Sequence, residues 1–133
     1  VNIYSPSHHE ATYARLLQLA RGCLQAGYPT IVDAAFLRRS EREAMQNLAR
    51  DLHVPFTILD CQAPMPLLRE RVQARFERGD DPSDADVAVL EQLAARREPL
   101  SPDEHGCTIE VHADRPLALA TLVARWLARP AAV

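Results

Sequence analysis

Three short apolar runs alternate with longer stretches of helical periodicity, and this alternation limits the possible folds more than any other feature. The runs cover residues 30–35, 56–61 and 107–111. Strands that alternate with helices favour a parallel sheet with helical crossovers. The first two runs are almost continuously apolar, as is typical of strands covered on both faces. The sequence therefore predicts an α/β fold with a three-layer parallel sheet of about three strands and five helices.

Capping signals mark the ends of the expected helices. Ser7 and Glu10 fit a capping box at the start of the first helix, and Gly27 is its expected stop. Pro64 or Pro66 opens the third helix, and Gly79 closes it. The other helices are expected at about 39–53 with Ser40 as cap, at about 83–97 with Ser83 and Asp86 as caps, and from Asp114 to the residue before Pro130. The remaining stretch, 98–106, is expected to be a loop.

The charged residues narrow the class of protein. The formal net charge is −3, and all fifteen basic residues are Arg. A negative chain does not attract nucleic acid by bulk charge, so a nucleic-acid partner is not expected. Without any Lys, the chain holds no residue for a Schiff base, a Walker A loop or a catalytic ammonium group.

The cysteines and the hydropathy indicate an intracellular protein without a metal site. Cys23, Cys61 and Cys107 are far apart and form no CxxC pair, and no His lies at a metal-ligand spacing from them. We expect them to be small buried side chains in a reducing cytoplasm. No apolar run approaches the ~18 residues of a membrane span, so no membrane partner is expected.

A carboxylate and three arginines follow the first expected strand. Ligands of open parallel sheets bind at the carboxyl ends of the strands. Asp33 would lie at such an end, where it could hold magnesium through water or accept a substrate proton. Arg38, Arg39 and Arg42 follow beside a helix N-terminus and could bind a phosphate. Alternatively, Asp33 caps a turn and the arginines form a solvated surface.

A second set of arginines lies on the third expected helix. Arg71, Arg75 and Arg78 are separated by four and three residues, which puts them on one helix face. They could form a lid that closes over the phosphates of a nucleotide. Alternatively, they pair with the acidic residues that follow, in an ion-pair network.

Taken together, several segments resemble a known family. The chain is similar to an ATP-binding, AAA-type P-loop family whose members are often fused behind an aminoglycoside-phosphotransferase-like domain. Wider relatives are gluconate kinase-like, zeta-toxin-like and polynucleotide kinase-like enzymes. The segments that carry the resemblance are 13–17 (YARLL), 27–39 (GYPTIVDAAFLRR), 58–61 (ILDC), 68–72 (LRERV), 81–86 (DPSDAD), 89–91 (VLE) and 98–100 (EPL).

The resemblance implies a role for each candidate residue. Asp33 would be the catalytic residue beside the substrate, and Arg38, Arg39 and Arg42 would contact the substrate or its phosphates. Arg71, Arg75 and Arg78 would belong to the nucleotide lid. The complete domain would use ATP and magnesium to phosphorylate a small molecule or a polynucleotide.

The chain departs from the family pattern at the phosphate-binding loop. The family's first strand, its G-x-x-x-x-G-K-[ST] loop and the following helix are missing, and the four glycines are isolated. Residues 1–133 would then be one partial domain, truncated at its N-terminus, that does not bind ATP tightly. The missing strand lies in this fold between the strands at 30–35 and 56–61. We therefore expect these two strands to pair directly, or a second copy to supply the pairing in a homodimer.

Two functions remain open at this point. In the first, the chain is the substrate and lid portion of an ATP-dependent phosphotransferase, is inactive alone, and needs an upstream P-loop segment as its partner. In the second, it is a degenerate, non-catalytic binding or dimerisation module that recognises phosphorylated ligands. The phosphoryl acceptor is not indicated by the sequence, and neither is activity of this chain by itself.

Overall fold

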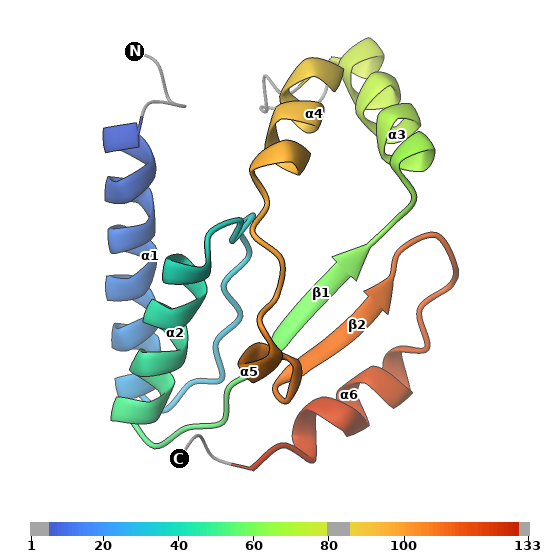
Figure 1. Ribbon diagram of the computed structural model, residues 1–133. Coiled ribbons are helices and arrows are strands. Elements are labelled where there is room, and N and C mark those ends of the chain that lie inside the picture. Colours follow the sequence, from blue (N-terminus) through green and yellow to red (C-terminus); the bar gives the residue numbers. More distant parts are fainter. Residues whose placement is uncertain (1–5, 80–85, 131–133) are drawn as a thin grey trace. The chain divides into compact units, whose positions relative to one another are not determined.

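The structure is a computed structural model that describes residues 6–79 and 86–130 (Figure 1). The chain divides into two compact units. The first consists of residues Val1–Phe56 and Pro130–Val133, and the second of residues Thr57–Arg129. The expectation that residues 1–133 form a single partial domain stays a prediction.

The first unit is built on two helices that pack side by side, α1 (Pro6–Gln25) and α2 (Arg39–Asp51) (Figure 1). Its core consists of Ala20, Met45 and Leu48, surrounded by partly buried apolar side chains from α1 and from the segments on both sides of α2. After α1 the chain turns at Gly27, whose φ of 87° suits a residue without a Cβ. The N–H of Tyr28 donates to the carbonyl of Cys23 at 3.1 Å, which closes the helix end. The predicted stop at Gly27 is thus confirmed.

The strand expected at 30–35 is not formed, and this part of the prediction is wrong. The segment runs without regular structure between α1 and α2. Val32 packs against the core of the first unit, whereas Ile31 is 83% exposed. A strand forms only where a neighbour pairs with its backbone, and the described residues place no strand beside this segment. The expected direct pairing of 30–35 with 56–61 is therefore also absent, while pairing with a second copy stays a prediction.

The second unit contains a two-stranded parallel sheet. Strand β1 (Ile58–Gln62) pairs with β2 (Thr108–His112), with Ile58 opposite Thr108 and Asp60 opposite Glu110. The connection between them contains the helices α3 (Met65–Arg78), α4 (Val87–Arg96) and α5 (Pro102–His105). Helix α6 (Leu119–Leu127) returns beside β2 (Figure 1). A parallel pair joined by a helical crossover confirms the α/β class.

The sheet is smaller than expected. Within residues 6–79 and 86–130 it has two strands instead of three, and there are six helices instead of five. The three-layer arrangement stays a prediction. The extra helix is α5, in the stretch expected to be a loop, where the carboxylate of Glu104 accepts the N–H of Ser101 at 2.8 Å.

Four helix starts also differ from the expectation. Helix α1 begins at Pro6 and already contains Ser7, its expected cap. Helix α2 begins after Arg38 rather than at the expected cap Ser40. Helix α4 begins after Asp86, whose side chain accepts the N–H of Val89 at 2.9 Å, and Ser83 lies outside the described residues. Helix α6 begins at Leu119, five residues after Asp114. Pro116 disfavours helical backbone at Arg115, directly after the expected cap.

Candidate functional site

Asp33 and Arg38 lie in the first unit on the segment that leads into α2, and Arg39 is the first residue of that helix. All three side chains are exposed. The Nε of Arg39 donates to Glu43 Oε1 at 2.7 Å, one turn further along α2. No ion pair of the Arg38 guanidinium is found among residues 6–79 and 86–130. The segment and the start of α2 thus present a carboxylate and two guanidinium groups to solvent.

Arg42 has a different environment from the one predicted. It is 5% exposed, and its Nη1 donates to the carbonyls of Phe36 at 2.9 Å and Leu37 at 3.4 Å. A guanidinium in this position satisfies backbone acceptors that would otherwise be buried without partners. Arg42 therefore holds the segment before α2 in place, and its burial disfavours the substrate contact expected from the sequence.

A cluster of side chains that sequence reasoning missed surrounds the same segment. The hydroxyl of Tyr13 on α1 accepts the N–H of Phe36 at 2.9 Å, and the two rings meet edge to face at 5.3 Å. Glu41 on α2 accepts the N–H of Arg38 at 3.3 Å and also contacts the Nε2 of His9. The helical spacing of Tyr13 predicted only an apolar core position, so it did not reveal that the hydroxyl binds backbone 23 residues away.

The environment of Tyr13 predicts a loss of stability in alkali. Burial raises the pKa of its phenol, although the N–H donated by Phe36 opposes the shift. The folded chain thus keeps the proton where an unfolded tyrosine loses it, so this contribution is intact below about pH 10 and is lost as the pH rises further. We expect the melting temperature to fall more between about pH 9 and 11 in the native chain than in Tyr13→Phe. Tyr28→Phe, which alters an exposed phenol, should keep the full fall. Equal falls in all three proteins would contradict the assignment.

The expected lid residues lie on α3 in the second unit. Arg71 Nη2 donates to the carbonyl of Ala113, in the turn after β2, at 2.7 Å. Arg75 and Arg78 are exposed in the last turn of the helix. Of the acidic residues that could pair with them, Asp80, Asp81 and Asp84 lie outside the described residues, and Asp86 caps α4. The lid and the ion-pair network both stay predictions.

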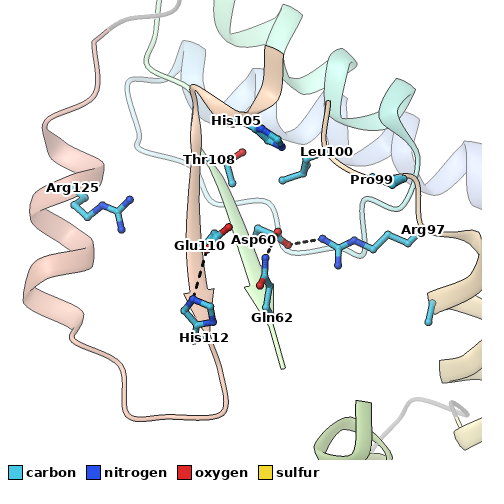
Figure 2. A pocket seen from close by; sticks show the side chains of 11 residues that line it. Asp60, Gln62, Arg97, Pro99, Leu100, His105, Thr108, Glu110, His112 and Arg125 are labelled. Carbon is cyan, nitrogen blue, oxygen red and sulfur yellow. Dashed lines mark hydrogen bonds and ion pairs between the residues drawn. The ribbon is translucent and has the colours of Figure 1, made fainter. Parts of the chain in front are cut away.

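A concave region of about 860 Å³ lies over one face of the two-stranded sheet, in the second unit (Figure 2). Its floor consists of side chains that alternate along the strands: Asp60 and Gln62 from β1, and Thr108, Glu110 and His112 from β2. Arg97 Nη2 reaches Asp60 Oδ1 at 2.8 Å, and Gln62 Nε2 donates to Asp60 Oδ2 at 2.9 Å. Most of the polar groups shown therefore already have partners within the protein.

None of the seven predicted site residues lines this region. The period-two pattern of polar residues in both strands was the signal that could have revealed it. Asp60 and Glu110 stand opposite each other, and two carboxylates in that arrangement destabilise a sheet unless cations lie nearby. Arg97 supplies such a cation to Asp60, and His112 lies 3.7 Å from Glu110. Contacts within the protein thus account for much of the polarity of this face.

Possible metal ligands are spread over the described part of the chain. There, no three His, Cys, Asp or Glu side chains are grouped so that they could hold a metal ion. No helix in that part is long and apolar enough to cross a membrane. Cys23 and Cys61 are exposed, contrary to the expectation of burial, and Cys107 is partly buried.

Comparisons with known proteins place the chain in a family. Residues 3–100 match the family model described as AAA domain. Uncharacterised proteins of Mycobacterium tuberculosis (Rv2004c) and Mycobacterium bovis (Mb2027c) are 30% identical over 95 residues, which are 71% of this chain and 18% of theirs. The chain thus aligns with less than a fifth of the length of these relatives. No solved structure gives a significant match. Since the family model covers well over half of the chain, the protein belongs to the AAA domain family, whose fold is the α/β fold of the P-loop NTPases.

Proposed function

We propose that this chain is the substrate and lid portion of an ATP-dependent phosphotransferase, and that it is inactive without a phosphate-binding loop. One observation carries the proposal: the chain matches the family over residues 3–100 and yet contains no lysine. The Walker A lysine and the backbone around it supply most of the grip on the β- and γ-phosphates in such enzymes. A chain without that lysine needs the loop from another segment.

In this proposal the two units carry different tasks. Asp33 accepts the proton of the acceptor hydroxyl, and Arg38 and Arg39 hold the acceptor or its phosphate groups. Their exposure on the segment before α2 and at the start of that helix supports this division of roles. Arg71, Arg75 and Arg78 cover the nucleotide phosphates from α3. ATP and Mg²⁺ bind tightly only when the phosphate-binding loop is present.

The second candidate function is a non-catalytic module that recognises phosphorylated ligands, as a monomer or a homodimer. The exposed Arg38 and Arg39 would serve equally well for that purpose. The two candidates differ in their genetic context. The phosphotransferase requires a reading frame upstream of Val1 that encodes G-x-x-x-x-G-K-[ST] within roughly 50 residues. A start codon directly before Val1 would contradict the phosphotransferase and favour the module.

The lid assignment predicts a specific loss of nucleotide affinity. In the chain extended by its phosphate-binding loop, Arg71→Ala combined with Arg75→Ala is expected to weaken ATP binding about tenfold to a hundredfold, because charge-assisted contacts to phosphates are removed. Arg50→Ala, a change at an exposed helical arginine of the first unit, is the matched control and should leave affinity unchanged. Calorimetry with ATP and Mg²⁺ measures both. Unchanged affinity in the double variant would assign the α3 arginines to surface ion pairs.

A further inference from the structure

Phe36 has a backbone conformation that its side chain disfavours. Its φ is 47°, in the left-handed region that residues with a Cβ rarely adopt. It lies between Asp33 and Arg38, the two ends of the exposed segment before α2. Such a conformation persists only where the surrounding structure imposes it, and such residues cluster at functional sites.

Side chains from two helices impose the conformation at Phe36. Its N–H donates to the hydroxyl of Tyr13 on α1, and its carbonyl accepts from Arg42 on α2, both at 2.9 Å. The Phe36 ring packs edge to face against the Tyr13 ring. Both backbone polar groups of Phe36 thus form hydrogen bonds with side chains, one from α1 and one from α2.

Glu41 fixes the backbone at Arg38, the next part of the segment. Its carboxylate is 7% exposed, accepts the N–H of Arg38 through Oε2, and contacts His9 of α1 through Oε1. The backbone of Arg38 is therefore fixed while its guanidinium extends into solvent. A cation on a fixed backbone loses less conformational freedom when it binds an anion than one on a mobile loop.

We propose that Tyr13 and Glu41 are positioning residues, which hold the backbone of Phe36 and Arg38 so that the Arg38 guanidinium is preorganised for a phosphate-bearing ligand. This inference rests on the proposed function, since it assigns the same segment to the ligand. Neither Tyr13 nor Glu41 needs to touch the ligand. They act through the backbone of the residues that do.

Tyr13→Phe is the sharpest test, because it removes one hydroxyl and keeps the ring. Tyr28→Phe makes the same chemical change at a residue that is 68% exposed, and it serves as the matched control. In Tyr13→Phe the hydrogen exchange of the Phe36 amide is expected to rise about fivefold to tenfold, as for one lost neutral hydrogen bond. The amide of Leu48, in the core of α2, reports global unfolding and should change far less. Equal increases at both amides would overturn the inference, because they would show only a loss of global stability.

Pyrophosphate is the ligand probe, and the chemical shift of the Arg39 backbone N–H is the readout, because this amide is present in every variant. We expect Arg38→Ala to abolish the shift and Tyr13→Phe to weaken the apparent affinity about threefold to tenfold. Normal affinity in Tyr13→Phe, together with a loss in Arg38→Ala, would overturn the positioning role and leave the proposed function intact. No binding by the native chain, or no effect of Arg38→Ala, would instead contradict the proposed function. In that case, only the hydrogen exchange of the Phe36 amide tests whether Tyr13 positions the segment.

Glu41 provides a second, independent variant with a conservative rescue. Glu41→Ala removes the acceptor of the Arg38 N–H and should raise the exchange of that amide about fivefold to tenfold, with a similar loss of pyrophosphate affinity. Glu41→Gln keeps a side-chain oxygen at the same distance along the chain, so it should restore most of both. A failure of Glu41→Gln to restore either quantity would contradict positioning through this hydrogen bond.

Discussion

Ile109→Ala is expected to lower the free energy of unfolding of the second unit by about 3 kcal/mol. Ile109 is the second residue of β2 and is completely buried, with 0% of its surface exposed. Replacing a fully buried isoleucine by alanine removes apolar contacts and leaves a cavity, at a combined cost of about 2–5 kcal/mol. Small domains have about 5–15 kcal/mol of stability in total, so the change removes a large fraction of it.

Leu59→Ala is the matched control for this prediction. Leu59 is the register partner of Ile109 on β1, but it is 42% exposed. Its replacement should cost about 1 kcal/mol or less, because less apolar surface returns to water. Urea unfolding followed by circular dichroism measures both variants. Equal losses would contradict the burial of Ile109 and the exposure of Leu59 on which this prediction depends.

The sequence predicted two of the three strands well, because each of these two apolar runs has the other as a partner strand. The runs at 56–61 and 107–111 became β1 and β2 with shifts of one or two residues. The run at 30–35 has an equally apolar composition but did not become a strand. Strand formation depends on a neighbour that can lie far away in sequence, whereas the apolar pattern reports only what a segment could bury.

Helix ends were predictable where a single residue decides them. Gly27 and Gly79 both adopt positive φ at the ends of α1 and α3, as expected for residues without a Cβ. Starts were less predictable, because several residues compete for each cap. Phe76 shows a further limit: it has the helical spacing of a core residue, yet it is 68% exposed on α3.

The candidate site was predicted only in its exposed part. Asp33, Arg38 and Arg39 were identifiable because they follow an apolar run and precede a helix. The contacts of Tyr13 with Phe36 and of His9 with Glu41 join residues 23 and 32 positions apart, and no local pattern encodes them. The same holds for the buried Arg42, whose guanidinium donates to the carbonyls of Phe36 and Leu37.

The largest expected effect on function comes from adding the phosphate-binding loop. ATP with Mg²⁺ is expected to bind the 133-residue chain with a Kd no tighter than about 1 mM, since arginines alone do not enclose the β- and γ-phosphates. Adding a strand, a phosphate-binding loop and a helix of the family's type should improve the Kd by about a thousandfold or more, which corresponds to about 4 kcal/mol. Replacing the Walker A lysine in the extended chain should remove most of this gain.

The central claim is that this chain is a segment of a P-loop phosphotransferase that lacks the phosphate-binding loop. Calorimetric titration of the 133-residue chain with ATP and Mg²⁺ tests this claim most directly. No measurable heat, or a Kd no tighter than about 1 mM, is the predicted result. A Kd in the low micromolar range would contradict the claim, because it would show that residues 1–133 hold the nucleotide without a phosphate-binding loop.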